Sequence, residues 1–422
     1  MALHFFSRRA ALLLMLLVAI GATWLALRWS SGPIGPIGIR TVDGTAEFFD
    51  RATGDRFVPR GANYVRLAPM APGDSNLWHS TFSPEFYDAL AADRALEQMH
   101  AAGFNVVRVY LDCCRPNGNA GDPGGGVSKA YVANVVDFLL KAETHRMFVL
   151  MVLELTPADG GYNDSWAALC CESFDRENLR YLPPGGDDGE QRFNHDLIEA
   201  LKADEAPLDR VFAYDLNNEV VFDTSAPPLS LSTGLVLTAN GQTYDMARPD
   251  DKERMMDDNL VAWIDRQRDV IRAVQPDALV TVSFFPPSGV TPPWRLSGWR
   301  TRALPAISRS TADFIDLHAY PGFGVGFDAS ATDFELTGRE TKPMIIGEFG
   351  AFRHAYLNAD DAAEALTEWQ SASCRFGFDG WMLWTWDTFE RTDLWSAVSD
   401  QGQIARALSP NFRTDPCNPS GN

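Results

Sequence analysis

Two short apolar segments of this chain each lead into a glutamate. One run, at residues 211–216, is followed by Glu219, and the other, at residues 343–346, is followed by Glu348. Short apolar runs of this kind are typical of buried parallel strands. Cleavage of a glycosidic bond needs one carboxylic acid to protonate the leaving oxygen and a second carboxylate to attack the sugar or to activate water. Glu219 and Glu348 are therefore a candidate pair for this chemistry, provided that the fold brings them together.

An arginine lies inside another apolar run. Arg108 follows residues 104–107, and a charged side chain within a buried strand is costly unless it meets an opposite charge. We expect Glu348 to be its partner, because the guanidinium would keep that carboxylate ionised. The hydroxyl of Tyr320 could hold the same carboxylate.

Three further side chains stand at the ends of expected strands. Asn218, next to Glu219, could donate a hydrogen bond to a sugar hydroxyl. Trp384 offers a flat apolar face to a sugar ring, although tryptophans are also common in barrel packing. His318, taken alone, is more typical of a buried, hydrogen-bonded core residue.

Eight strand-like runs, most of them separated by amphipathic stretches, would position these residues. Alternating strands and helices predict a parallel sheet with right-handed crossovers, and eight such units predict a (β/α)8 TIM barrel, in which the C-terminal ends of the strands meet around one mouth. The expected strands are residues 61–65, 105–110, 147–155, 211–216, 279–283, 314–318, 344–347 and 380–386. The expected helices are residues 84–102, 129–145, 191–203, 252–274 and 360–375, with the fifth and sixth crossovers poorly defined.

The connections between these elements differ in length. Long loops at residues 112–127, 156–188 and 220–250 follow strands on the mouth side, where barrel enzymes build their specificity. Loop tryptophans are candidate sugar platforms, although each could equally be buried in loop packing: Trp78, Trp166, Trp294 and Trp299. A small hairpin of residues 46–50 and 56–59 is expected to cap the barrel floor.

The ordered set of strand-end motifs resembles that of clan A glycoside hydrolases, most closely family 5, the cellulase-like family. The motifs are an arginine at strand two, Asn-Glu at strand four, His-x-Tyr at strand six, Gly-Glu-Phe-Gly at strand seven and tryptophan at strand eight, and they span residues 61–387. The resemblance implies a retaining double displacement on a β-linked glycan such as a glucan or mannan, without a metal ion or organic cofactor. It would make Glu219 the acid/base and Glu348 the nucleophile. The other matched side chains would bind substrate: Arg108, Asn218, His318, Tyr320 and Trp384.

Glu154 departs from the family pattern, in which a histidine often ends strand three. A third carboxyl group at the mouth could bind a sugar hydroxyl or an amino sugar, raise a neighbouring pKa, or pair with an arginine. It is therefore a further candidate substrate-binding residue, and it leaves the subfamily and the substrate open.

Two other classes of function are compatible with these residues. One is a catalytically inactive, membrane-tethered carbohydrate-binding barrel. The other is a metal-dependent hydrolase, although no His-Glu-x-x-His motif supports it, with the ligands Glu154, Glu219, His318 and Glu348. The chain has neither a Walker-type phosphate loop nor a Gly-x-Ser-x-Gly elbow, which argues against nucleotide and serine-hydrolase chemistry.

The charge and the N-terminus indicate where the chain works. A formal net charge of −20 over 422 residues argues against nucleic acid as a partner and suits a neutral or cationic ligand. The apolar residues 10–27, preceded by two arginines, predict an uncleaved membrane anchor or, as the alternative, a cleaved signal peptide. We expect an exported, monomeric protein that meets the membrane through this segment only and acts on an oligo- or polysaccharide.

The expected layout is an anchor or signal at residues 1–29, a Pro/Gly linker at 30–45, the barrel at 46–412 and a C-terminal tail at 413–422. Six cysteines fit an oxidising compartment. Bridges between the two loops that hold the first four, and one between the last two, would account for all six: Cys113, Cys114, Cys170, Cys171, Cys374 and Cys417.

Overall fold

The computed structural model describes residues 35–69, 73, 76–111, 120–154, 156–169, 173–286, 298–322, 326–338 and 340–418. The expected anchor at residues 1–29 lies outside these residues, as do Trp294 and four of the cysteines, Cys113, Cys114, Cys170 and Cys171. No helix among the described residues combines the length and the apolar character that crossing a bilayer demands.

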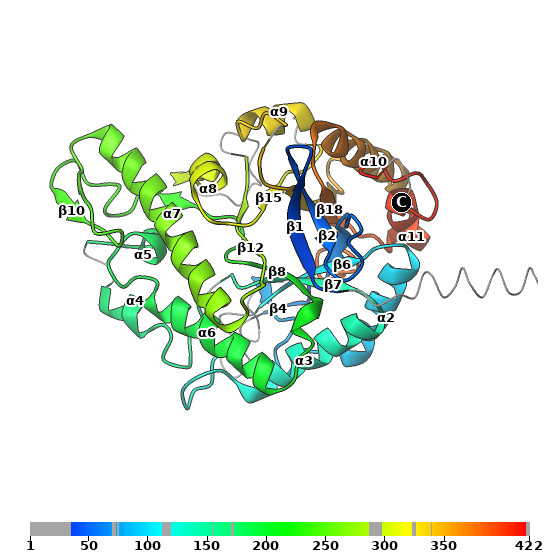
Figure 1. Ribbon diagram of the computed structural model, residues 1–422, viewed down its shortest axis with the longest axis horizontal. Helices are drawn as coiled ribbons and strands as arrows, with labels where there is room; N and C mark the ends of the chain where they lie inside the picture. Colours follow the sequence, from blue (N-terminus) through cyan, green and yellow to red (C-terminus); the bar gives the residue numbers. More distant parts are fainter. Residues whose placement is uncertain are drawn as a thin grey trace, which may run out of the picture.

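Eight parallel strands form a closed barrel at the centre of the molecule, and helices surround it (Figure 1). In barrel order the strands are β3 (Arg60–Asn63), β6 (Val106–Tyr110), β7 (Phe148–Val152), β8 (Val211–Asp215), β12 (Val280–Thr281) with β13 (Ser283–Phe284), β15 (Ile315–His318), β16 (Met344–Phe349) and β18 (Gly380–Leu383). The fifth strand has two segments: β12 pairs with β8 and β13 pairs with β15, so Val282 between them joins the two halves of the ring. The (β/α)8 barrel predicted from the sequence is confirmed.

Long amphipathic helices cover most of the outside of the barrel. The five that the periodicity predicts are α2 (Ala89–Ala101), α3 (Lys129–Thr144), α6 (Asp188–Ala203), α7 (Pro249–Val274) and α10 (Ala359–Phe376). Side-chain caps start several of them; Asp88, for example, accepts hydrogen bonds from the first N–H groups of α2. The fifth and sixth crossovers hold helices of two turns, which are too short to show a helical period. The shorter helices are α8 (Ala303–Arg309), α9 (Phe327–Asp333) and, after the eighth strand, α11 (Ser399–Leu408).

The connections contain several short elements. β4 (Leu67–Pro69) and β5 (Leu77–His79) form a hairpin after the first barrel strand. A second hairpin, β10 (Leu235–Leu237) with β11 (Thr243–Asp245), belongs to the long loop after β8. The remaining elements are α4 (Asp164–Leu169), α5 (Asn178–Tyr181), η1 (Leu208–Arg210), β9 (Phe222–Asp223), β14 (Trp299–Arg300), β17 (Ala351–Phe352) and β19 (Leu394–Trp395).

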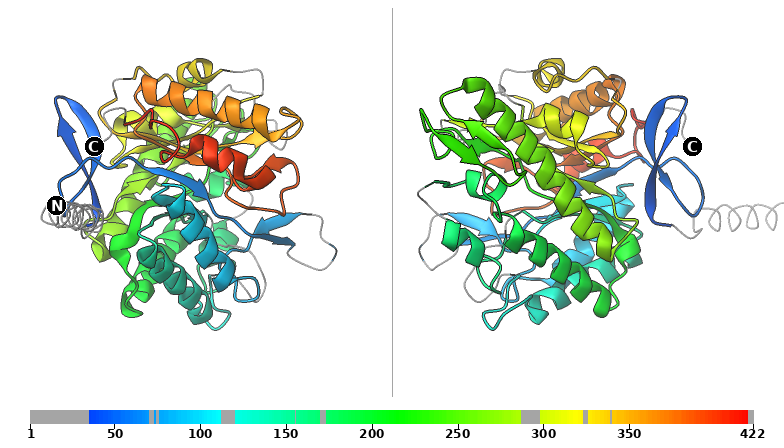
Figure 2. Two further views of the ribbon diagram at one scale, coloured as in Figure 1. Left: turned by 90° about the vertical axis from the view of Figure 1, so that its right-hand side faces the viewer. Right: turned by 60° about the vertical axis from the view of Figure 1, so that its left-hand side comes forward.

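A hairpin caps the barrel floor, and the strand pair expected from the sequence is one part of it. β2 (Thr45–Asp50) pairs, as expected, with the segment that follows it, through a bridge between Phe49 and Arg56 and through backbone hydrogen bonds from Asp50 N–H to Asp55 O and from Phe57 N–H to Phe48 O. The longer hairpin, in which β1 (Ile37–Val42) pairs with β2, was not expected. The turn is Asp43-Gly44, where both residues have positive φ, and this dipeptide matches the backbone of a two-residue hairpin turn. Residues 37–45, expected to belong to the linker, are therefore part of the folded body. Figure 2 shows the hairpin lying across one end of the barrel.

The barrel interior is apolar at the floor and polar higher up. At the floor, Phe48 of the hairpin is completely buried and packs against Phe212 and Phe314, with ring centroids 5.2 and 5.3 Å apart. Successive side chains of a strand point to opposite faces, so the next inward residue after Phe314 is Asp316, two positions further along. On β8 a register shift places Asp215 three positions after Phe212. The polar residues above the floor are Asn63, Arg108, Asp215 and Asp316, all fully buried.

The C-terminal segment packs onto the barrel. The disulfide predicted between Cys374 and Cys417 is present and connects the segment to α10. Asp415 also forms an ion pair with Arg60 at the start of the first barrel strand.

Candidate active site

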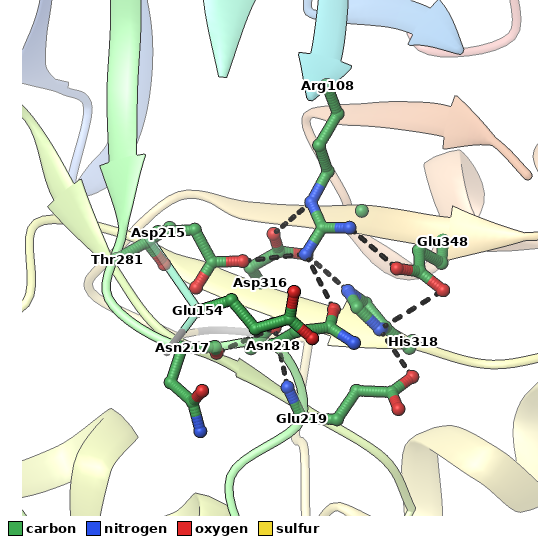
Figure 3. Close-up of polar contacts among 12 residues, drawn as sticks. Arg108, Glu154, Asp215, Asn217, Asn218, Glu219, Thr281, Asp316, His318 and Glu348 are labelled. Carbon is green, nitrogen blue, oxygen red and sulfur yellow. Dashed lines mark hydrogen bonds and ion pairs between the residues drawn. The ribbon is translucent and has the colours of Figure 1, made fainter. Parts of the chain in front are cut away.

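Glu348 lies at the C-terminal end of β16 and accepts three hydrogen bonds (Figure 3). Arg108 Nη1 donates to Glu348 Oε1 over 2.6 Å, which is the contact that the sequence predicts. Tyr110 donates its hydroxyl to the same oxygen. Tyr320 donates its hydroxyl to Oε2 over 2.5 Å, again as expected. With the side chain almost fully buried, these donors fix the orientation of the carboxylate.

A β-bulge turns Glu348 toward the mouth. The pairing of β15 with β16 skips one residue, so His318 lies opposite Glu348 instead of Gly347. The skipped position tolerates only glycine, because a Cβ atom there would lie 2.1 Å from Asp316 Oδ1. Bulges of this kind re-aim side chains near functional sites.

Glu219 follows β8 on a turn. Its φ is +58°, a left-handed conformation that is uncommon for a residue other than glycine. Its backbone N–H donates to Ser283 Oγ over 3.1 Å, and its Oε1 forms a 2.8 Å hydrogen bond with His318 Nδ1. The Glu219 side chain is partly exposed, whereas His318 is fully buried.

The two glutamates face each other across the mouth. One oxygen of Glu219, Nδ1 of His318 and one oxygen of Glu348 all lie within 4.8 Å of one another. Figure 3 shows the imidazole of His318 between the two carboxyl groups. The fold therefore brings together the two residues that the sequence places 129 positions apart.

Arg108 is the centre of a buried network. Besides Glu348, it donates to Asp215 Oδ2 over 2.7 Å and to Asn218 Oδ1 over 3.0 Å. Because the Asn218 carbonyl oxygen is held in this way, its amide N–H group is left to donate elsewhere, and it makes no such contact among the described residues. Burial alone would lower the pKa of Arg108, but Tyr110 and the surrounding carboxyl groups raise it well above its usual value.

Three carboxyl groups surround this one guanidinium, so the barrel interior is acidic. Asp316 is the most distant, with oxygens 3.9 Å from Arg108 Nε and 3.7 Å from His318 Nε2. Burial raises the pKa of Asp316 well above its usual value, and Asp215 and Glu348 add to the shift. Burial also raises the pKa of Asp215, although Arg108 opposes that effect. Of the carboxyl groups around Arg108, Asp316 is therefore the one for which burial most strongly favours the protonated form.

The two tyrosines act as permanent hydrogen-bond donors. Burial raises the pKa of Tyr110 and of Tyr320 well above the usual value, and the negative charge of Glu348 adds to both shifts. Their hydroxyls therefore stay protonated around Glu348 at all ordinary pH values.

Trp384 and Glu154 form parts of the wall. Trp384 is 8% exposed, and its ring lies edge-on to Tyr110 with centroids 5.7 Å apart. Glu154 follows β7 with a φ of +44°, and it bonds His79 of β5 instead of an arginine.

The structure also shows site residues that the sequence interpretation missed. Tyr110 and Asn63 line the barrel next to Arg108, and Asp215 and Asp316 complete its charge network. A signal was present for two of them: Tyr110 lies two residues from Arg108 and Asp316 lies two residues from His318, each on the same face of a strand. His79 had no such signal, because it comes from a hairpin in a loop.

The loop tryptophans differ in their surroundings. Trp78 is 37% exposed on β5 and stays a candidate platform. Trp166 donates its indole N–H to the carbonyl oxygen of Gly186, which indicates a role in loop packing. Trp299 pairs through its backbone with Asp223 in the β9–β14 ribbon.

One group of described residues has the composition of a metal site, namely Glu219, His318 and Glu348. Their surroundings suit a cation poorly. Glu348 already accepts hydrogen bonds from Arg108, Tyr110 and Tyr320, so its lone pairs are engaged and a guanidinium would stand beside the ion. Glu154, the fourth expected ligand, is bonded to His79.

Comparison with known proteins identifies related folds. No protein-family model and no curated protein matches the sequence. Among solved structures, the chain is similar to an endo-1,4-β-mannanase from Rhizomucor miehei, with a TM-score of 0.54 and 14% identity over 89% of this chain and 98% of that one. It is similar to a β-mannanase from the mussel Mytilus edulis, with a TM-score of 0.54 and 18% identity over 91% and 98% of the two chains. It also matches a glycoside hydrolase family 5 mannosidase from Rhizomucor miehei, with a TM-score of 0.56 and 13% identity over 90% and 98%.

Each similarity covers nearly the whole of the compared structure. Because the sequence identities are low, the similarities establish the fold alone. They confirm, at that level, the resemblance inferred from the strand-end motifs. The chain therefore has the (β/α)8 fold of family 5 glycoside hydrolases.

Proposed function

We propose that this protein is a retaining glycoside hydrolase that cleaves O-glycosyl bonds in a β-linked glycan such as a mannan or glucan. The observation that carries the proposal is the separation of the two glutamates, whose facing oxygens lie within 4.8 Å. Retaining glycosidases hold their carboxyl groups about 5 to 5.5 Å apart, whereas inverting ones leave about 6.5 to 9.5 Å for a water molecule. The short separation supports a double displacement.

The first step forms a covalent intermediate. The carboxylate of Glu348 attacks the anomeric carbon, the bond from that carbon to the leaving oxygen breaks, and Glu219 gives its proton to that oxygen. In the second step Glu219 removes a proton from water, the water oxygen attacks the anomeric carbon, and the bond to Glu348 breaks. Glu219 is protonated again and the sugar is released with its original configuration.

The surrounding residues suit these roles. Arg108 and the two tyrosine hydroxyls stabilise the negative charge of Glu348 before attack and when it leaves. His318 holds Glu219 in place through their 2.8 Å hydrogen bond. Asn218 has a free amide N–H for a sugar hydroxyl, and Trp384 offers a ring face or edge to the sugar.

The substrate class is proposed from the neighbouring folds. The similar structures are mannanases and a mannosidase, so β-mannan is the first polysaccharide to test. Glucans belong in the same panel, because identities below 20% do not carry a substrate from one protein to another.

Activity of the Glu219→Gln and Glu348→Gln variants tests the proposal. Each change keeps the shape of the side chain and removes a reacting carboxyl group, so we expect kcat on aryl β-mannosides or β-glucosides to fall by about 10³-fold or more. Glu364→Gln, on the exposed side of α10, is the matched control and should retain full activity. NMR of the first product should show retention of configuration.

Two outcomes would contradict the proposal. Inversion at the anomeric carbon would exclude the double displacement. A wild-type protein that binds the glycans but hydrolyses none of them would instead be the inactive carbohydrate-binding barrel.

We further propose that residues 1–29 anchor the protein in a membrane, with the barrel on the extracytoplasmic side and monomeric. The apolar run at residues 10–27 supports this. The full chain should partition with membranes and resist extraction at high salt, and a chain that starts at residue 35 should be soluble. Recovery of the full chain in the soluble fraction would contradict the anchor.

A further inference from the structure

Glu154 and His79 form a polar pair in the wall of the site. Glu154 Oε2 and His79 Nδ1 lie 2.6 Å apart, and both side chains are 21% exposed. Neither lies on the surface of a helix, where such pairs are common: Glu154 follows β7 and His79 ends β5. The pair therefore joins two loops of the barrel mouth.

The pair is in direct contact with the groups that hold Glu348. The imidazole of His79 packs on the ring of Tyr110, with centroids 4.1 Å apart. Tyr110 donates its hydroxyl to Glu348, and its ring also meets Trp384. A sugar bound at Glu348 would therefore lie near this polar pair, with Tyr110 between them.

The backbone of Glu154 is held in a conformation that its residue type disfavours. Its φ of +44° lies in the left-handed region, where a side chain with a Cβ atom is strained. A glycine or asparagine would meet the backbone requirement at lower cost. A strained non-glycine residue beside a candidate active site indicates that the side chain itself is needed there.

One oxygen of Glu154 remains available to a ligand. Its Oε2 is bound to His79, and its Oε1 accepts no hydrogen bond from any of the described residues. A partly exposed carboxylate whose position is fixed at one oxygen is suited to accept a hydrogen bond from a sugar hydroxyl at the other.

We propose that Glu154, oriented by His79, binds a hydroxyl group of the neutral sugar unit that sits over Glu348, and thereby sets which sugar the site accepts. The inference rests on the proposed function for the identity of the ligand as a sugar. Glu154 is the residue that touches the sugar, and His79 is a positioning residue that acts through it. A carboxylate that accepts this hydrogen bond also disfavours a sugar that carries its own carboxylate at that position.

Binding of monodeoxy sugars tests the inference. The measurement is the dissociation constant of methyl β-mannoside and methyl β-glucoside, and of their 2-, 3-, 4- and 6-deoxy analogues, on the Glu348→Gln background, so that hydrolysis does not interfere. With Glu154 intact, we expect one deoxy position to weaken binding by about tenfold or more. Adding Glu154→Gln should reduce that discrimination to about twofold and leave the other positions unchanged. His79→Gln should have the same effect, and the double change should add little to either single one.

Two further variants keep the test decisive. Asp93→Asn breaks a pair of the same type, in which Asp93 Oδ1 and His145 Nε2 lie 2.8 Å apart on the helical exterior, and it should leave sugar discrimination intact. Glu154→Gly removes the carboxylate while relieving the left-handed backbone, so it should raise Tm and still lose the discrimination.

The results separate this inference from the proposed function. The inference is overturned if every deoxy position weakens binding equally in protein with and without Glu154, or if the sugars do not bind at all. Normal discrimination in a wild-type protein that never hydrolyses a glycoside would overturn the proposed function and leave this sugar contact in place.

Discussion

At the scale of single residues, the site depends on how one arginine is shared. Arg108 contacts Asp215 and Glu348 at 2.7 and 2.6 Å, and Asp316 at 3.9 Å. Three ionised carboxylates around a single guanidinium would leave two uncompensated negative charges inside the barrel, which is very costly. A proton on Asp316 reduces that cost, in agreement with its raised pKa.

Replacing Asp316 or Asp215 by asparagine should therefore have opposite consequences. A raised pKa in the folded state means that the stability linked to Asp316 is complete at low pH and is lost as pH rises through that pKa. Asp316→Asn removes this loss, so at pH 7 its free energy of unfolding should equal or exceed that of the wild type. Asp215→Asn removes the closer partner of Arg108 and should cost about 3 kcal/mol. Urea denaturation at pH 7 compares the two variants. A larger loss of stability for Asp316→Asn would contradict the view that burial favours the protonated form of Asp316.

The candidate residues were predictable where strand-end motifs contain them. Arg108, Glu219 and Glu348 come from such motifs, and the structure brings them together. Tyr110 was missed although it follows Arg108 by two residues, since the pattern was interpreted for charge and not for the inward face of the strand. His79 could not be predicted, because its contact with Glu154 depends on the path of a loop.

At the scale of elements, the strands and long helices were predictable because burial imposes a period on them. At the floor, the expected pairing of β2 with the segment from Arg56 is present, but the longer hairpin of β1 with β2 was missed. The turn of that longer hairpin is Asp43-Gly44, a dipeptide that is itself a strong hairpin signal. The short helices α8 and α9 and the split of the fifth strand leave no periodic trace in the sequence.

The junction between the floor and β18 should respond to pH. Asp379, just before β18, accepts a hydrogen bond from the backbone N–H of Met344 and contacts Arg56. Burial raises its pKa from 3.8 to about 6. Its folded form therefore binds a proton more tightly than the unfolded chain does, and the stability linked to it falls by roughly 2–3 kcal/mol as pH rises from about 4 to about 6.

The comparison of wild type with Asp379→Asn isolates this effect from the other acidic groups. Relative to the wild type, Asp379→Asn should become more stable by that amount between pH 4 and pH 7, measured by urea denaturation. Asp277→Asn, at a side chain that is 74% exposed, is the control, and its free energy of unfolding should depend on pH in the same way as that of the wild type. If the free energy of unfolding of Asp379→Asn also followed that of the wild type at every pH, the Asp379 carboxyl group would not titrate in this range.

At the scale of the whole molecule, a disulfide holds the C-terminal segment of the described chain against the barrel. The disulfide between Cys374 and Cys417 closes a loop with a sequence separation of 43. Chain entropy predicts that a loop of that size stabilises the folded state by about 4 kcal/mol. The double variant Cys374→Ser/Cys417→Ser should therefore unfold at lower urea concentration, and its free energy of unfolding should fall more steeply with urea, because the unfolded chain becomes less compact. Intact stability in that variant would show that the segment is held by its other contacts, such as Asp415 with Arg60.

The position of the floor hairpin determines which way the candidate active site faces. The chain enters the folded body at β1, whose hairpin covers the N-terminal ends of the barrel strands, while Glu219 and Glu348 lie at the opposite ends. If the residues before β1 are fixed to a surface, that surface would thus lie on the floor side of the barrel. Long polymers arriving from the surroundings could then approach the glutamates without being obstructed by that surface.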